Sequence, residues 1–262
     1  QYYDAPLASR EQLSRVHDPA YVDEIFRIAP DEGLVYLDAD TLMGPHSLNA
    51  ALRAAGAAVL GVELVMSGKN NQAFCSVRPP GHHAERHRAM GFCIFNNVAV
   101  GAAHARQQYQ VQRVAIVDFD VHHGNGTEDI FRDDPDVLFC STFQHPFYPH
   151  SGADTQQEHI VNVPLPAASG GQAFRKAVEE HWLPRLDAFK PELILVSAGF
   201  DAFIDDPLGG MRVSAGEFRR LTALIVGVAF GLQFRGKAFG VGPGGAGDSA
   251  QFVFLITIIA ML

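Results

Sequence analysis

The chain has 262 residues, 47% of them hydrophobic, and a formal net charge of −9 at pH 7. This length and apolar content predict one sizeable soluble domain over residues 1–262, because no run of about eighteen apolar residues marks a membrane-spanning helix. The negative charge argues against non-specific binding to nucleic acid or to anionic membranes, both of which favour basic surfaces.

The cysteines and the start of the chain bear on the cell compartment. Cys75, Cys93 and Cys140 are odd in number, widely spaced and set in apolar sequence. They predict reduced, buried thiols rather than a disulfide or a redox site. No basic segment followed by an apolar stretch begins at Gln1, so we expect a cytoplasmic protein.

Helix-like and strand-like segments alternate along the chain. Residues 47–68 begin with a capping-type serine, carry small and apolar residues at helical spacing and end at a glycine, which predicts a helix. Helices are also predicted over 97–108 and 171–189. Three apolar runs without polar alternation are typical of strands covered on both faces, and they are 113–120, 136–143 and 192–200. This order predicts an α/β fold with helices on both faces of a parallel sheet.

Polar residues follow two of the predicted strands, at the edge of the sheet where binding and catalytic sites of such folds usually lie. Asp118, Asp120 and His122 come after VAIV, and in extended geometry their side chains would point the same way. Asp201 comes after LILVSAGF. Asp120, His122 and Asp201 would together form an oxygen, nitrogen, oxygen set that suits zinc with an open fourth position. The alternative is that the aspartates cap turns and His122 is a core residue, but such buried ionisable groups are costly without compensation.

Two adjacent histidines stand in the segment RPPGHHAERHRAMGFCIFNN, residues 78–97. Neighbouring side chains diverge in regular structure, so an irregular, proline-led segment is needed to direct His82 and His83 into one site. The pair therefore indicates a reactive site. His87 and His104 are interpreted as ordinary surface or packing residues.

Several motifs in order resemble the signature blocks of the histone deacetylase superfamily. They are RPPGHHA at 78–84, GFCIFNN at 91–97, DFDVHHGNG at 118–126 and SAGFD at 197–201. The likeness runs from about Val16, where VHDPAYV also fits, to about Arg212, and is nearest to the class II and bacterial branch that includes acetylpolyamine amidohydrolases and acetoin-utilisation proteins. It implies an arginase-like three-layer α/β fold with a central, mainly parallel sheet, and a zinc hydrolase that removes acyl groups from N-acyl-lysine or acylated polyamines.

The same scaffold also occurs in arginases that hold two manganese ions. A binuclear site needs further bridging carboxylates, which the arginase pattern places at the equivalents of Gly124 and Gly199. Both positions are glycine in this chain. One divalent ion per chain is therefore expected.

The resemblance also implies roles for the histidine pair beside a metal-bound water. His82 would be held by Asp118, and His83, the expected general base and acid, would face Asn125. A carboxylate partner raises the basicity of an imidazole whereas an amide only orients it, so the two rings should titrate apart.

Aromatic walls and a potassium ion complete what the resemblance implies. Phe92 and Tyr148 would sandwich the aliphatic stem of an acyl-lysine or acylated amine, although simple core packing would explain both residues as well. A potassium ion would lie behind the site, with Asp118 and Ser141 among its ligands.

The chain departs from the family pattern near its end, where Pro243-Gly244-Gly245-Ala246 replaces Glu-Gly-Gly-Tyr. The missing tyrosine hydroxyl would polarise the substrate carbonyl, and loss of such a donor typically costs about 10²–10³ in rate. Activated esters should suffer less than amides. Residues after about 236 are also atypical, which suggests a buried terminal element or a truncation or frameshift.

Three functions therefore stay open for the sequence. They are a zinc deacetylase, a zinc-dependent esterase or weak deacylase of activated acyl groups, and a non-catalytic acyl-lysine binding module. The expected partners are a small acylated amine, an acyl-lysine peptide or an ester, with oligomer formation left open.

Overall fold

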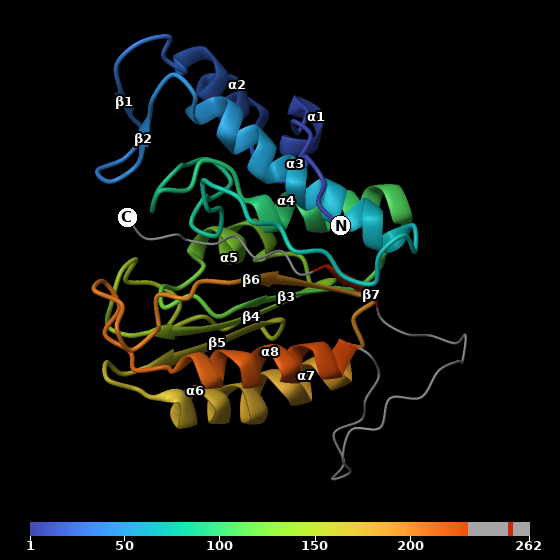
Figure 1. Ribbon diagram of the computed structural model, residues 1–262, viewed down its shortest axis with the longest axis vertical. Coiled ribbons are helices and arrows are strands. Elements are labelled where there is room, and N and C mark those ends of the chain that lie inside the picture. The colour runs from blue at the N-terminus through green and yellow to red at the C-terminus, as the bar shows by residue number, and fades with distance from the viewer. Residues whose placement is uncertain (230–250, 254–262) are drawn as a thin grey trace.

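A parallel β-sheet lies between two layers of helices (Figure 1), which confirms the predicted α/β class. The computed structural model describes residues 1–229 and 251–253. The strand order is β5-β4-β3-β6-β7, and every neighbouring pair is parallel. The five strands are β3 (Val114–Asp118), β4 (Val137–Gln144), β5 (Ile160–Leu165), β6 (Leu193–Ser197) and β7 (Gln251–Val253). A separate antiparallel pair consists of β1 (Val35–Tyr36) and β2 (Leu42–Met43).

Helices from the two halves of the chain cover opposite faces of the sheet (Figure 1). The upper layer in this view contains α1 (Arg10–Leu13), α2 (Pro19–Ile28), α3 (Ser47–Met66), α4 (Asn97–Tyr109) and α5 (Asn125–Phe131). The lower layer contains α6 (Gly171–Ala177), α7 (Leu183–Phe189) and α8 (Ala215–Ala229). A π-helical turn, Val178–Trp182, joins α6 to α7, so the helix predicted over 171–189 is continuous but irregular. Pro184 cannot donate a backbone hydrogen bond, and the wider turn ends at Trp182, shortly before it.

Strands β3, β4 and β6 are buried on both faces, which explains why their sequences lack polar alternation. Val114 and Ile116 of β3 pack into the cluster that includes α3 and α4, whereas Ala115 and Val117 pack into the cluster under α6 to α8. Every residue of β3 and β6 is buried. The three cysteines are free and buried, as predicted.

Helix α3 begins differently from the prediction. Ser47 is its first helical residue, and the cap position is His46, whose side chain makes no capping hydrogen bond. The Ser47 hydroxyl instead accepts a hydrogen bond from the backbone N–H of Gly44 at 2.9 Å. By length and composition α3 could cross a membrane, but 67% of its apolar window is buried inside the protein, as in the core helix of a soluble protein.

His17 fastens the histidine-rich segment to the N-terminal helices. Its Nδ1–H donates to the backbone carbonyl of Glu85 at 2.9 Å, and its Nε2 accepts from the backbone N–H of Asn96, also at 2.9 Å. Both contacts are made by one neutral tautomer of the ring. Burial lowers the pKa of His17 from 6.5 to about 4, although hydrogen bonds to the backbone oppose the shift.

The pKa of His17 makes the stability of the fold depend on pH. Its folded pKa is depressed, so the unfolded chain binds more protons between pH 6.5 and about 4. The contribution of His17 is complete above pH 6.5 and is lost as the pH falls, by at most about 1.4 kcal/mol per unit. Urea denaturation at pH 7 and pH 5 should therefore show a smaller drop for His17→Gln than for the unchanged protein. Equal drops would contradict this assignment.

Candidate metal centre and active site

Asp120, His122 and Asp201 meet at the carboxyl edge of the sheet. Strand β3 ends at Asp118, so the extended geometry expected through His122 is wrong, and the chain turns there instead. The parallel register of β3 and β6 pairs Asp118 with Ser197, which places the loops that follow these strands side by side. One ligand atom from each of the three residues lies within 4.8 Å of the others.

The hydrogen bonds of this cluster leave an acceptor for a cation. His122 Nδ1 lies 2.9 Å from Asp120 Oδ1 and 3.0 Å from Asp201 Oδ2. Asp120 Oδ2 is buried and has no hydrogen-bond partner among the described residues. An unpaired buried carboxylate oxygen is costly, and two carboxylates with one imidazole are a donor set that divalent metals accept. The residues therefore fit a divalent cation.

Close packing of the carboxylates shifts their proton affinities. Burial and the neighbouring Asp201 raise the pKa of Asp120 to about 6. For Asp201 burial also acts upward, but the hydrogen bond from His122 and its charge lower the pKa on balance. Burial lowers the pKa of His122, yet its hydrogen bonds to both aspartates outweigh this and raise it to about 10. Without a metal the protonated His122 ring partly balances the two carboxylates, and a divalent cation bound here would displace that proton.

Gly124 and Gly199 leave no space for further metal-bridging carboxylates. A Cβ atom at Gly199 would lie 1.9 Å from Asp120 Oδ2, and one at Gly124 would lie 2.4 Å from Asp118 Oδ2. Either side chain would push a carboxylate out of position. The packing therefore fits one metal ion better than two.

The proline-led segment brings both histidine rings to the cluster. The rings of His82 and His83 are 3.9 Å apart between centroids, and the His83 ring is 5.8 Å from that of His122. His82 Nδ1 lies 3.0 Å from Asp118 Oδ2, and His83 Nδ1 lies 2.7 Å from Asn125 Oδ1. These are the two partners that the resemblance implied.

The two rings differ in proton affinity, as their partners predict. Burial lowers the pKa of His82, but the charges of Asp118 and Asp120 outweigh this and raise it to about 9. Burial and the neighbouring His82 hold the pKa of His83 well below its usual value. The amide of Asn125 only partly offsets that effect.

Aromatic rings flank the histidines on the side of the loop after β4. The Tyr148 ring stands edge-on to His83, with centroids 5.2 Å apart, and Phe147 stacks on His122 at 5.1 Å. Phe92 has a left-handed backbone (φ 64°) and is 51% exposed, and no ring contact joins it to the histidines among the described residues. Phe147 was missed by sequence reasoning, although it precedes the predicted Tyr148 directly.

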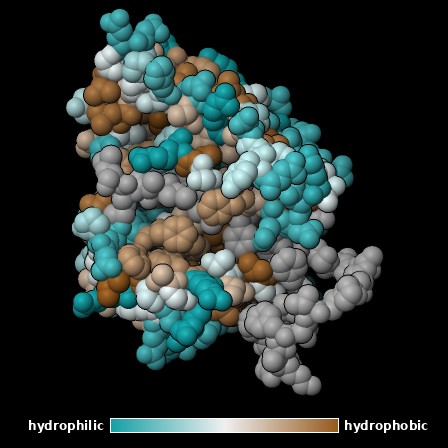
Figure 2. Space-filling view, in the orientation of Figure 1, coloured by the Kyte–Doolittle hydropathy of each residue, from teal (hydrophilic) through white to brown (hydrophobic). Residues whose placement is uncertain are grey.

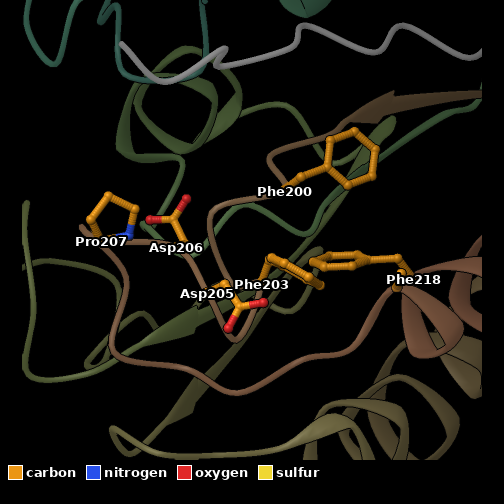
Figure 3. Close-up of a pocket in the computed structure, with 7 residues that line it drawn as sticks. Phe200, Phe203, Asp205, Asp206, Pro207 and Phe218 are labelled. Atoms are coloured by element: carbon orange, nitrogen blue, oxygen red, sulfur yellow. The ribbon is translucent and has the colours of Figure 1, made fainter.

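A hydrophobic pocket lies on the other side of the Asp201 loop. It is lined by Phe200, Phe203, Asp205, Asp206, Pro207, Ala215 and Phe218. Figure 3 shows these side chains around the pocket, where the rings of Phe200 and Phe218 stand edge-on with centroids 5.2 Å apart. Phe200 also contacts Phe119 (5.8 Å between centroids), so the residues directly before Asp120 and Asp201 pack behind the metal cluster. Hydrophobic surface also gathers near the middle of the face shown in Figure 2, at the level of the sheet.

The remaining predicted residues fall into three groups. Ser141 pairs with Asp118 across β3 and β4, and its buried hydroxyl has no hydrogen-bond partner among the described residues. His87 is exposed beside Asp18, and His104 is buried beside Glu63, so neither ring joins the cluster. Ala246 and the segment after about 236, apart from β7, lie outside the described residues.

Comparison with known proteins assigns the family. The model of the histone deacetylase domain matches residues 1–246, so the chain belongs to the histone deacetylase family. It is 41% identical to "Histone deacetylase 10, chloroplastic" of Oryza sativa subsp. japonica and 41% identical to a "Histone deacetylase-like amidohydrolase" of Pseudomonas aeruginosa. It is 42% identical to "Polyamine deacetylase HDAC10" of Rattus norvegicus.

These matches cover most of this chain but only part of each relative. Each covers 86% of the chain, and respectively 55%, 61% and 41% of the rice, bacterial and rat proteins. Among solved structures, the HDA15 HD domain superimposes with a TM-score of 0.84 at 32% identity, covering 97% of this chain and 68% of that one.

Replacing Gly199 by alanine should weaken metal binding. The added methyl group must displace the Asp120 carboxylate, and disturbing the support of a metal ligand typically costs about 10- to 100-fold in affinity. Gly216→Ala is the matched control, because a Cβ atom there would meet only Ser214 Oγ at 3.7 Å. Competition with a chromophoric chelator measures both variants. Unchanged zinc affinity in Gly199→Ala would show that Asp120 is not a ligand.

Proposed function

We propose that the protein is a zinc-dependent hydrolase that removes acyl groups from N-acyl-lysine or acylated polyamines. The observation that carries the proposal is the position of His83 beside the cluster of Asp120, His122 and Asp201. Two carboxylates and one imidazole suit zinc with an open coordination position. When bound, the cation would supply Lewis-acid chemistry at this point. Family membership and the name of the rat relative support the choice of reaction.

The hydrogen bonds of His83 suit it to proton transfer. Its Nδ1–H donates to Asn125 Oδ1, which fixes the tautomer and leaves Nε2 free to accept a proton. His83 takes a proton from the water that attacks the acyl carbon. It returns that proton to the nitrogen of the departing amine as the carbon–nitrogen bond breaks. His82 is held by its hydrogen bond to Asp118 and orients the neighbouring ring of His83.

The aromatic residues support a substrate with an aliphatic stem. Tyr148 and Phe147 present rings beside His83 and His122, so a methylene chain could lie against them while its acyl group reaches the cluster. Phe92 is the proposed opposite wall. Asp118 and Ser141 are proposed to help bind a potassium ion, because the buried Ser141 hydroxyl lacks a partner among the described residues.

A second candidate is hydrolysis of activated esters. Ala246 stands where the family has a tyrosine whose hydroxyl supports the developing oxyanion. An ester with a good leaving group depends less on that support than an amide does. The two candidates share one set of site residues and differ in the expected ratio of ester to amide turnover.

One assay tests the proposed reaction class. An acetyl-lysine anilide and a p-nitrophenyl acyl ester are offered to zinc-loaded protein, with and without a chelator. We expect the chelator to abolish turnover and zinc to restore it, with the ester turned over faster. Turnover that persists in chelator would contradict a metal hydrolase. Tight binding of the acyl-lysine without any turnover would favour a binding module instead.

Loss of the His83 imidazole should suppress turnover without removing the metal. His83→Ala is expected to lower kcat by about 10²–10⁴, the usual contribution of general acid–base catalysis. The zinc content should stay at the level of the unchanged protein, because His83 is not a ligand. His87→Ala is the control, since that ring is exposed and distant from the chemistry. Equal turnover in the two variants would remove His83 from the mechanism.

A further inference from the structure

The loop after β4 carries aromatic residues to the candidate active site. This wall loop, residues 145–159, joins β4 to β5 and has no regular secondary structure. Phe147 and Tyr148 lie near its start, against His122 and His83. Loops of this length are seldom well placed by their own backbone alone. Something else must hold the two rings where they stand.

A buried hydrogen-bond network outside the metal cluster holds the middle of this loop. His123 Nε2–H donates to Glu128 Oε2 at 2.9 Å, which leaves Nδ1 to accept from the Ser151 hydroxyl, also at 2.9 Å. Glu128 further accepts hydrogen bonds from the Thr155 hydroxyl at 2.8 Å and from Asn162 Nδ2 at 2.7 Å. Ser151 and Thr155 belong to the wall loop, whereas the other three residues belong to the scaffold.

Close packing at the next residue, Gly152, restricts the loop further. Gly152 has a left-handed backbone (φ +87°), and a Cβ atom there would lie 2.6 Å from two atoms of the His123 ring. Its carbonyl accepts a hydrogen bond from Asn162 Nδ2 at 2.9 Å. Only glycine lets the loop pass so close to the imidazole. Backbone and side chains of the loop are therefore both held three to seven residues after Tyr148.

The charged group of the network is costly to bury and is well supplied with hydrogen-bond donors. His123 is 1% exposed and Glu128 is 3% exposed. Burial raises the pKa of Glu128, but the hydrogen bonds from His123, Asn162 and Thr155 outweigh it and lower the pKa to about 2. The carboxylate is thus charged at neutral pH and bound by three donors. Such a group stabilises a unique geometry because each lost partner leaves a buried charge less satisfied.

We propose that His123 and Glu128 are positioning residues that, through Ser151 and Thr155, hold the wall loop so that Phe147 and Tyr148 form the substrate wall. Glu128 lies on α5, the helix whose first residue, Asn125, holds His83. One short helix thereby fixes both the proton-transfer histidine and the aromatic wall beside it. We call the hydrogen bonds that join His123 and Glu128 to Ser151 and Thr155 the tether. Its existence does not depend on the proposed function. The proposed function is needed only for the claim that a substrate lies against Phe147 and Tyr148.

A serine, a histidine and a glutamate in contact also have the composition of a nucleophilic triad. The surroundings argue against that reading. The glutamate oxygens already bind Thr155 and Asn162. The histidine ring is covered by Gly152 and Phe143.

The test compares Ser151→Ala, which removes the hydroxyl, with Ser151→Thr, which keeps it. Hydrogen exchange in the zinc-loaded full chain should become about three- to tenfold faster for peptides covering 146–156 in Ser151→Ala, matching the loss of one net hydrogen bond. Exchange in α4 is the internal control. For the acetyl-lysine anilide, KM should rise by a similar factor while kcat and zinc content stay unchanged. Ser151→Thr should restore both values.

The outcomes separate the tether from the proposed hydrolase function. Exchange that is equally slow in Ser151→Ala overturns the tether, whether or not the protein turns over any substrate. Faster exchange with an unchanged KM overturns its role in positioning the wall. Hydrolysis of p-nitrophenyl acetate by zinc-free protein that disappears in Ser151→Ala would overturn positioning in favour of a nucleophilic serine. A protein with altered exchange and no acyl turnover would retain the tether and refute the proposed function alone.

Discussion

Buried negative charge at the carboxyl edge of the sheet is the constraint on which the site depends. Asp118, Asp120 and Asp201 are between 0% and 2% exposed, and burying carboxylates is costly unless each is paired. Asp118 is hydrogen-bonded to His82 Nδ1, and Asp201 accepts a hydrogen bond from the backbone N–H of Val121. Asp120 keeps one oxygen without a partner among the described residues. A divalent cation held by Asp120, His122 and Asp201 would satisfy this oxygen.

The rigid parts of the fold explain how these charges are held together. Parallel pairing of β3 with β6 fixes the separation of the loops that carry Asp120 and Asp201. Phe119 and Phe200, the residues directly before these ligands, pack against each other behind them. The sheet thus sets the spacing of the ligands, and hydrogen bonds from the backbone N–H groups of His122 and Val121 orient the carboxylates of Asp120 and Asp201. Irregular segments then bring the histidines and the aromatic residues to the cluster. Hydrogen bonds fasten each of these segments to the scaffold.

The amino-acid sequence was sufficient for the architecture and for most of the polar site. Apolar runs without alternation predicted the strands because both faces of the sheet are covered, and the motif blocks predicted the partners of His82 and His83. Strand periodicity did not predict the path of the chain after Asp118, where hydrogen bonds from Asp120 N–H to Asp118 and from Val121 N–H to Asp201 replace the extended geometry. The capping role expected of Ser47 was wrong for a similar reason, because its hydroxyl bonds to Gly44 outside the helix.

Contacts between distant segments were also out of reach of sequence patterns. Glu128 lies five residues after His123, close to the motif that was interpreted through its metal ligands alone. Ser151 and Asn162 come from later segments of the chain. Only the fold shows that they share one buried network. Periodicity likewise did not reveal the π-helical turn Val178–Trp182.

The central claim is that Asp120, His122 and Asp201 form a site for a single divalent cation. Equilibrium dialysis of metal-stripped protein against zinc, followed by elemental analysis, counts the bound ions directly. We expect one zinc ion per chain in the unchanged protein and none in Asp201→Ala. Two ions per chain, or one ion retained in Asp201→Ala, would contradict the ligand set on which the account rests.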